Sequence, residues 1–286
     1  MNKRVRKHKF YRRWKRRFLA GLSSLEKLRA GCLRDAKPEA IHNLRVTLRR
    51  VRLLATIGRP VLRKSRVTQL RQWALTTANT LSRMRDQDVV LEWLKIHAPE
   101  PKRDQLLQQS RTSLWRLTRP KLAPFPMPGW KELRPGKPAA LRPGKVRKKF
   151  LKERQKIQAA LLRSARRFHQ LDTAQLHEFR RALRRLRYLR ELALSRREQK
   201  NDRRLEQLVG FQEALGEMQN CAAVRDFFSS RPLLQSQSRV VRLARAQERQ
   251  WFKRAEAHLA VFCGRPQCRH RRLYHSPDLL GTVKLH

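Results

Sequence analysis

Two segments of the chain repeat one arrangement of a histidine and three arginines. At about 100° per residue of an α-helix, the four side chains of each segment fall within a stripe of about 80°. The two sets are His42, Arg45, Arg49 and Arg52, and His177, Arg180, Arg184 and Arg187. Apolar residues such as Leu44 and Leu183 fall on roughly the opposite face. We therefore predict two helices that bury an apolar face and present a ladder of cations.

The chemistry of these stripes favours a polyanionic ligand. Two guanidinium groups about 6 Å apart repel each other by roughly 1–3 kcal/mol, and few acidic residues lie close enough in sequence to relieve them. Arginine donates several hydrogen bonds to phosphate oxygens, and a ladder rising about 5 Å per turn fits a chain of phosphates better than a single one. Histidine can gain a proton near neutral pH when a polyanion raises its pKa. Tyr188, which flanks the second stripe, could donate a phenolic hydrogen bond.

A segment that follows the first stripe, "RMRDQDVV", contains both basic and acidic residues. Arg83 and Arg85 are further candidates for anion binding. Asp86 and Asp88 could form a metal site or an acid–base pair, but we favour a role in ion pairs that hold basic residues in place. A phosphate-hydrolysing metal site needs several convergent carboxylates. Asn220 occupies the position of Asp86 in the second half, so a symmetric site is not expected.

The overall composition also predicts a polyanionic partner and a helical fold. Seventy Lys and Arg against 22 Asp and Glu give a formal net charge of +48. Only 7% of the residues are aromatic, which weakens the case for base stacking on single-stranded nucleic acid. The charge is not confined to one amphipathic segment, and no apolar run is long enough to span a membrane, so we predict no membrane partner. The basic N-terminus lacks the apolar run of a signal peptide, and the four cysteines are too few for a disulfide framework. We therefore expect a cytoplasmic protein.

The helical pattern divides the chain into two similar halves. Hydrophobic periodicity and the few glycines predict four helices in residues 1–118 and four in 146–262. The first stripe aligns with the second at an offset of 135 residues, and residues 81–90 align with 215–224 at an offset of 134. This indicates an internal duplication. We predict an all-α fold of two four-helix bundles related by a pseudo-twofold axis.

Two further segments lie outside the predicted bundles. Residues 119–145 are basic and rich in proline and glycine, which favours a solvated connector, although contact with the ligand is an alternative. The tail, residues 263–286, contains Cys263, Cys268, His270 and His275. These four could hold zinc, but their spacing departs from common zinc motifs, and we predict no metal and no cofactor.

The two His-x-x-Arg helices, with "LSRMRDQDVVLEWL" and "LVGFQEALGEMQN" behind them, resemble the CHAD domain, the histidine-bearing α-helical domain. The resemblance covers about residues 8–262 and implies two four-helix bundles that bind inorganic polyphosphate where the halves meet, often at polyphosphate granules. Carried over by position, the ligand residues would be those of the two stripes. Arg13, Arg17, Lys152 and Lys156 would be candidates of lower rank. The sequence "MQNCAAV" departs from the family's second aspartate-containing segment.

We therefore predict a non-enzymatic protein that binds inorganic polyphosphate through basic residues of both halves, in the cytoplasm and at polyphosphate granules. Two alternatives stay open. One is a nucleic-acid-binding protein, for which RNA is the first candidate. The other is a polyphosphate-processing enzyme. Against it, the sequence shows neither a glycine-rich phosphate loop nor a dense set of carboxylates. The β-rich triphosphatase domain fused to some CHAD domains has no counterpart in this sequence, so its activity is not expected.

Overall fold

The computed structural model describes residues 3–122, 124, 133, 143–229 and 238–263, and within these ranges the regular structure is entirely helical. The all-α prediction is confirmed. The helices of the first half are α1 (Lys3–Asp35), α2 (Pro38–Gly58), α3 (Lys64–Thr80), α4 (Ser82–His97) and α5 (Pro101–Thr118). Those of the second half are α7 (Pro143–Ala165), α8 (Thr173–Ala193), the short α9 (Arg196–Lys200), α10 (Arg203–Ser229) and α11 (Ser238–Phe262). Short 3-10 turns follow α2, α5 and α7.

The ends of several helices follow from local sequence. Pro38 and Pro101 begin α2 and α5, where the missing amide hydrogen of proline costs no helical hydrogen bond. Asp172 caps α8, because its side chain accepts a hydrogen bond from the amide of Gln175 while the glutamine side chain accepts one from the Asp172 amide. The first helix continues past Gly31 to Asp35, although glycine is often found where a helix ends.

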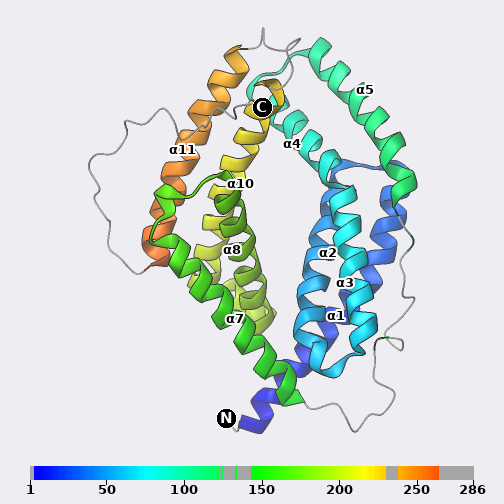
Figure 1. Ribbon diagram of the computed structural model, residues 1–286, viewed down its shortest axis with the longest axis vertical. Helices are drawn as coiled ribbons and strands as arrows, with labels where there is room; N and C mark the ends of the chain where they lie inside the picture. The colour runs from blue at the N-terminus through cyan, green and yellow to red at the C-terminus, as the bar shows by residue number, and fades with distance from the viewer. Residues whose placement is uncertain (1–2, 123, 125–132, 134–142, 230–237, 264–286) are drawn as a thin grey trace, which may run out of the picture.

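The helices form two groups that face each other (Figure 1). On one side stand α1, α2 and α3, and on the other α7, α8, α10 and α11. The groups meet where α7 packs against α1 and α2, and again where α4 crosses over to pack against α10. As a result α2 and α8, the two helices that carry the arginine stripes, lie on opposite sides of the interior.

The buried apolar residues form two clusters, and each cluster draws on both halves of the chain. The larger one joins α1, α2 and α3 to α7, α8 and α10, and its halves touch where the rings of Phe10 and Phe150 lie 4.7 Å apart. The smaller one joins α4 and α5 to α10 and α11, and includes Trp93 and Phe228. The halves therefore do not have separate cores. The division into 1–118, 119–145, 146–262 and 263–286, and the duplication itself, stay predictions.

The described part of the connector touches the body of the protein at two buried leucines. Leu122 follows α5, and its carbonyl accepts a hydrogen bond of 3.0 Å from Arg29. The carbonyl of Leu133 accepts one of 2.9 Å from the amide of Arg63, just before α3. Residues 119–121 form a 3-10 turn and residues 143–145 begin α7, whereas residues 123, 125–132 and 134–142 of the proposed solvated connector lie outside the described residues. Among the helices described, none is long and apolar enough to cross a membrane.

Candidate functional site

The two stripe helices bury the apolar faces that the sequence predicts. On α2, Leu44, Leu48 and Val51 are fully buried. On α8, Phe179 and Leu183 are buried in the same way. Because these faces are fixed in the core, the histidines and arginines of each stripe must lie on the other side of the helix. Both histidines are exposed, whereas the arginines that follow them are partly or largely buried.

The two stripes come together in the interior. We call Arg45, Arg49, Arg180 and Arg184 the arginine cluster; two members come from α2 and two from α8. Burial, followed by repulsion from Arg184 and Arg45, lowers the pKa of Arg49 to about 9. Burial and the charge of Arg184 lower the pKa of Arg180 to about 10. Guanidinium groups from both halves are therefore held close together in a poorly hydrated place, which is the condition for strong attraction of an anion.

Neighbouring helices hold two members of the arginine cluster in place. Arg45 donates hydrogen bonds to the carbonyl of Ala78 and to Ser82 Oγ, the latter at 3.2 Å, at the junction of α3 and α4. Arg180 donates to Gln219 Oε1 on α10. Because these acceptors are neutral, they orient the guanidinium groups without cancelling their charge.

The histidines lie at one end of the arginine cluster, and both have a lowered pKa. Partial loss of hydration, although the side chain keeps an exposed surface, is the largest cause for His42, followed by the charges of Arg85 and Arg49. Burial and the charge of Arg180 have the same effect on His177. Gln219 Nε2 lies 3.1 Å from His177 Nδ1. Arg85 and Gln219 stand at equivalent positions of the proposed duplication, so each histidine lies near the corresponding segment of its own half.

The opposite end of the site contains an aromatic ring and a carboxylate. The guanidinium groups of Arg50 and Arg187 each lie 5.1 Å from the centre of the Tyr188 ring, one from each half. Glu191 pairs with both arginines, at 3.3 and 3.4 Å. Cation–π contact is thus the role of Tyr188 that the structure describes, and the predicted phenolic hydrogen bond stays a prediction. Arg52 is partly buried. Burial is the largest cause that lowers the pKa of Arg52, and the charge of Arg71 is the next.

Sequence reasoning missed Arg50 and Gln219 as parts of this site. Arg50 follows Arg49 directly and falls beside the stripe, so helical geometry could have suggested it. Gln219 falls on α10 within the segment that aligns with residues 81–90, but its side-chain chemistry carries no anion-binding signal. Only the packing of α10 against α8 brings it to His177.

The segment "RMRDQDVV" lies on α4, and its residues have different environments. Arg85 reaches the site, near His42, and pairs with Glu92 at 3.5 Å. Arg83 is exposed, and its role in binding stays a prediction. Asp88 forms the ion pair that we expected: its carboxylate accepts from Arg111 Nε on α5, and the pair is buried.

Arg111 also stabilises the junction between α1 and α2. Its Nη2 donates a 2.6 Å hydrogen bond to the carbonyl of Ala36. Ala36 has a φ of 48°, in the left-handed region that a non-glycine residue adopts only at a cost. Asp88 therefore acts through Arg111 to hold the start of the stripe helix α2.

Asp86 is an acidic residue near the histidine end of the site, as Glu191 is at the other end. Burial raises its pKa, against the opposing charges of Arg45 and Arg85. Across the residues that the structure describes, no group of three or more His, Cys, Asp or Glu side chains is placed to hold a metal ion. Of the four candidate zinc ligands in the tail, Cys268, His270 and His275 lie outside the described residues.

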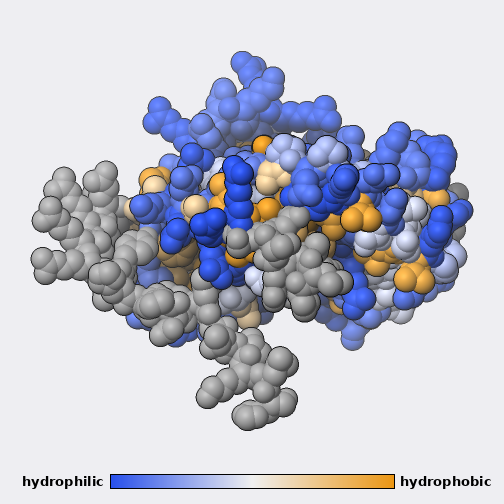
Figure 2. Space-filling view, turned by 90° about the horizontal axis from the view of Figure 1, so that it is seen from above, coloured by the Kyte–Doolittle hydropathy of each residue, from blue (hydrophilic) through white to orange (hydrophobic). Residues whose placement is uncertain are grey.

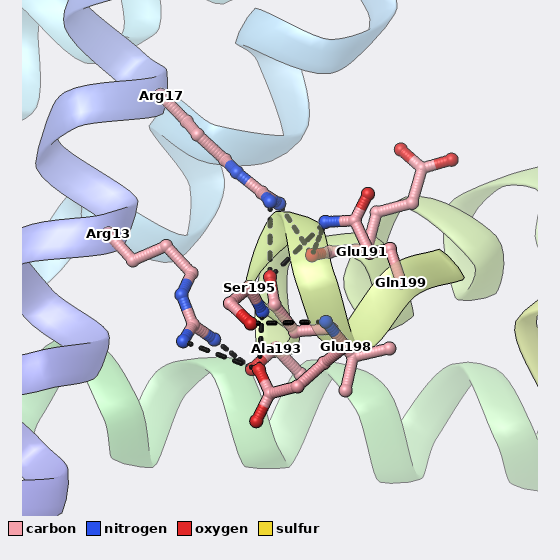
Figure 3. A network of polar contacts seen from close by, with 8 residues as sticks. Arg13, Arg17, Glu191, Ala193, Ser195, Glu198 and Gln199 are labelled. Carbon is pink, nitrogen blue, oxygen red and sulfur yellow. Dashed lines mark hydrogen bonds and ion pairs between the residues drawn. The ribbon is translucent and has the colours of Figure 1, made fainter. Parts of the chain in front are cut away.

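The lower-ranked candidates have other positions. Arg17 donates hydrogen bonds of 2.6 and 3.1 Å to the carbonyls of Glu191 and Leu194 at the end of α8, and Arg13 donates to the carbonyl of Ala193 (Figure 3). The last carbonyls of a helix lack the amide partners of a helix interior, so the two arginines, together with Gln199, cap the end of α8, and the arginines do so from a helix about 180 residues away. Lys152 and Lys156, on α7, are exposed.

A model of the CHAD domain family matches residues 16–229, about three quarters of the chain. The chain belongs to the CHAD domain family. The matched region contains both stripe helices and ends with α10, so α11 lies beyond it.

Solved structures are similar to this CHAD chain over most of its length. The crystal structure of the CHAD domain from the plant Ricinus communis has 16% sequence identity, covers 90% of this chain and 92% of its own, and has a TM-score of 0.55. PptA from Streptomyces chartreusis has 16% identity, covers 85% of this chain and 99% of its own, and has a TM-score of 0.48. At such identity the plant structure supports the CHAD fold alone. No curated protein matches the chain.

Proposed function

We propose that this CHAD domain protein binds inorganic polyphosphate at the arginine cluster. The observation that carries the proposal is that the charge of Arg184 acts on Arg49 across the interior. They come from opposite halves, and the charge of Arg184 contributes to lowering the pKa of Arg49. A ligand that bridges the halves must therefore be anionic and long enough to reach both stripe helices.

The site offers donors to such a ligand. Within the cluster, Arg45 and Arg180 donate to neutral acceptors, and beside the cluster Arg52 Nε is buried without a hydrogen-bond partner. A phosphate chain carries a negative charge and several acceptor oxygens at each step, so it offsets the repulsion and supplies the missing acceptors. A small anion would satisfy part of the cluster, whereas a chain would satisfy the arginines of both helices together.

The affinity test requires charge reversal within the cluster and a matched reversal elsewhere. Changing Arg49→Glu and Arg184→Glu together should reduce affinity for labelled long-chain polyphosphate by at least about a hundredfold, since each lost charged hydrogen bond is worth about 1.5–3 kcal/mol. The control changes Arg242→Glu and Arg249→Glu, which are exposed on α11 and alter the net charge equally. Titrations at constant salt, with circular dichroism to check the fold, would refute the proposal if both pairs lost affinity equally.

Two controls address the alternative functions. Excess unlabelled RNA, matched in phosphate concentration, should leave the polyphosphate complex largely intact; full displacement would favour a nucleic-acid ligand instead. We also propose that binding is not coupled to hydrolysis. Incubation with polyphosphate and Mg²⁺ or Mn²⁺ should release no orthophosphate, and time-dependent release would establish an enzyme.

We further propose that the protein acts in the cytoplasm, at polyphosphate granules. The support is the size of the charge: +48 over 286 residues favours a partner that is itself a dense polyanion. A fluorescent fusion should colocalise with granules, and the Arg49→Glu, Arg184→Glu variant should be diffuse. Colocalisation that survives this change would refute a granule attachment through the cluster.

A further inference from the structure

Helix α7 has a second row of cations, on the face opposite to the core. Its buried side chains, among them Phe150, Ile157 and Leu161, form one stripe of the helix. The opposite stripe spans about 80° and is exposed. We call it the outer ladder; it consists of Lys145, Lys148, Lys152, Lys156 and Arg163. The ladder extends for about 27 Å, at about 1.5 Å per residue.

The outer ladder has no acidic side chain within it to balance its charge. The acidic residue of α7, Glu153, lies away from the ladder and pairs with Lys149 at 2.7 Å and with Arg185 at 3.7 Å. Two pairs in the ladder, Lys148 with Lys152 and Lys152 with Lys156, are like charges four residues apart, which destabilise a helix. The ladder therefore has the same unbalanced character as the arginine cluster, but on the outside of the molecule.

The ladder and the arginine cluster are separate in space. α7 packs on α1, α2 and α8 through its apolar face, so the ladder faces away from the helices that carry the cluster. The cluster lies between α2 and α8, where its arginines interact across the interior. A short anion held at the cluster therefore does not contact the ladder. Two chains, or two distant segments of one chain, can occupy both.

The form of the ladder favours a flexible phosphate polymer over other polyanions. The phosphates of a duplex follow a spiral, so a straight row on one helix would touch only a short arc of them. Neutral positions of the exposed face, such as Gln155 and Ala159, offer no aromatic ring for stacking the bases of a single strand. Membrane binding would need an apolar face free to insert, and that of α7 is in the core. Much of the rest of the surface is hydrophilic as well, as the view of one end shows (Figure 2).

We propose that the outer ladder is a second polyphosphate site, so that one protein molecule bridges two polyphosphate chains. The inference rests on the proposed function, because it takes the same polymer as ligand for both sites. Its consequence is that the protein cross-links long chains, while the arginine cluster alone determines the binding of short ones. Lysine suits this role because its mobile point charge does not require a fixed phosphate geometry.

The test separates cross-linking from simple charge. The ladder variant changes Lys148→Gln, Lys152→Gln and Lys156→Gln. The control changes three exposed lysines on three different helices, Lys27→Gln, Lys95→Gln and Lys253→Gln, and removes the same charge. Light scattering is measured as long-chain polyphosphate is titrated into each protein, and affinity for a short chain is measured in parallel.

We expect the ladder variant to lose at least about fivefold in scattering and to keep its short-chain affinity within about twofold, while the control scatters like the unaltered protein. Equal loss in the control, or unchanged scattering of the ladder variant, would overturn the second site. Ladder-dependent binding of duplex DNA or of anionic vesicles, without loss of polyphosphate scattering, would overturn the choice of ligand. Failure of the proposed function looks different: the unaltered protein would not bind the short chain.

Discussion

Arg49 should oppose folding in the absence of ligand, and replacing it by glutamine should therefore stabilise the free protein. The fall of its pKa from 12.5 to about 9 would correspond to about 5 kcal/mol if all of it opposed folding, at about 1.4 kcal/mol per pH unit. Counterions reduce that repulsion, and the shorter side chain loses some packing. We expect a net gain of about 1–2 kcal/mol, or about 2–6 °C in melting temperature for a domain of this size.

The assay combines two measurements on the Arg49→Gln protein. Thermal unfolding followed by circular dichroism at neutral pH and low salt should show the higher melting temperature. Added salt should reduce the difference in melting temperature from the unaltered protein. Titration with polyphosphate should show at least a tenfold loss of affinity, because one charged donor is missing. Arg249→Gln, at an exposed position of α11, should change neither quantity appreciably. A melting temperature that falls or stays constant would refute the view that the cluster is held together against its own repulsion.

Three other predictions concern pH, an ion pair and a close approach. His42 and His177 have lowered pKa values in the free protein, and a phosphate chain favours the imidazolium form. Binding of polyphosphate should therefore take up protons, and its affinity should rise as the pH falls below about 7. For the double variant His42→Gln, His177→Gln, the affinity should depend less on pH. Arg111→Leu leaves the buried carboxylate of Asp88 unpaired, so it should lower the free energy of unfolding, measured in urea, by about 3–5 kcal/mol. The double variant Asp88→Leu, Arg111→Leu should lose less. Gly58→Ala would bring its Cβ into the indole ring of Trp14 on α1, so the free energy of unfolding from urea titration should fall by about 1–3 kcal/mol.

Much of the fold could be predicted because its helices carry strong local signals. Pro38, Pro101 and Asp172 mark helix starts through chemistry that acts within one turn. The burial of Leu44 and Phe179 follows from their place opposite the arginines. The hydrophobic pattern of residues 65–97 fits either one long helix or two in tandem, and the structure divides the segment at Leu81 into α3 and α4.

The site was harder to predict, because its decisive contacts join residues distant in sequence. Nothing near Arg17 indicates that its hydrogen bonds reach the end of α8, and position alone ranked it with the ligand residues. Position likewise grouped Lys152 with the anion site, although α7 turns this lysine outward because its apolar face is committed to the core. Sequence spacing can select candidate residues of the right type, whereas the packing of the helices decides which way each side chain faces.

The sequence by itself determined the composition of each stripe, since one helical period relates His42, Arg45 and Arg49 without reference to the rest of the chain. The tertiary structure decided that the stripes of α2 and α8 interact across the interior, and that Gln219 and Arg50 join them. The physical reason is the distance over which each interaction acts. Helical periodicity and capping depend on residues within a few positions of each other. Repulsion between guanidinium groups of the two halves arises only when the shared core forms and holds these groups close together.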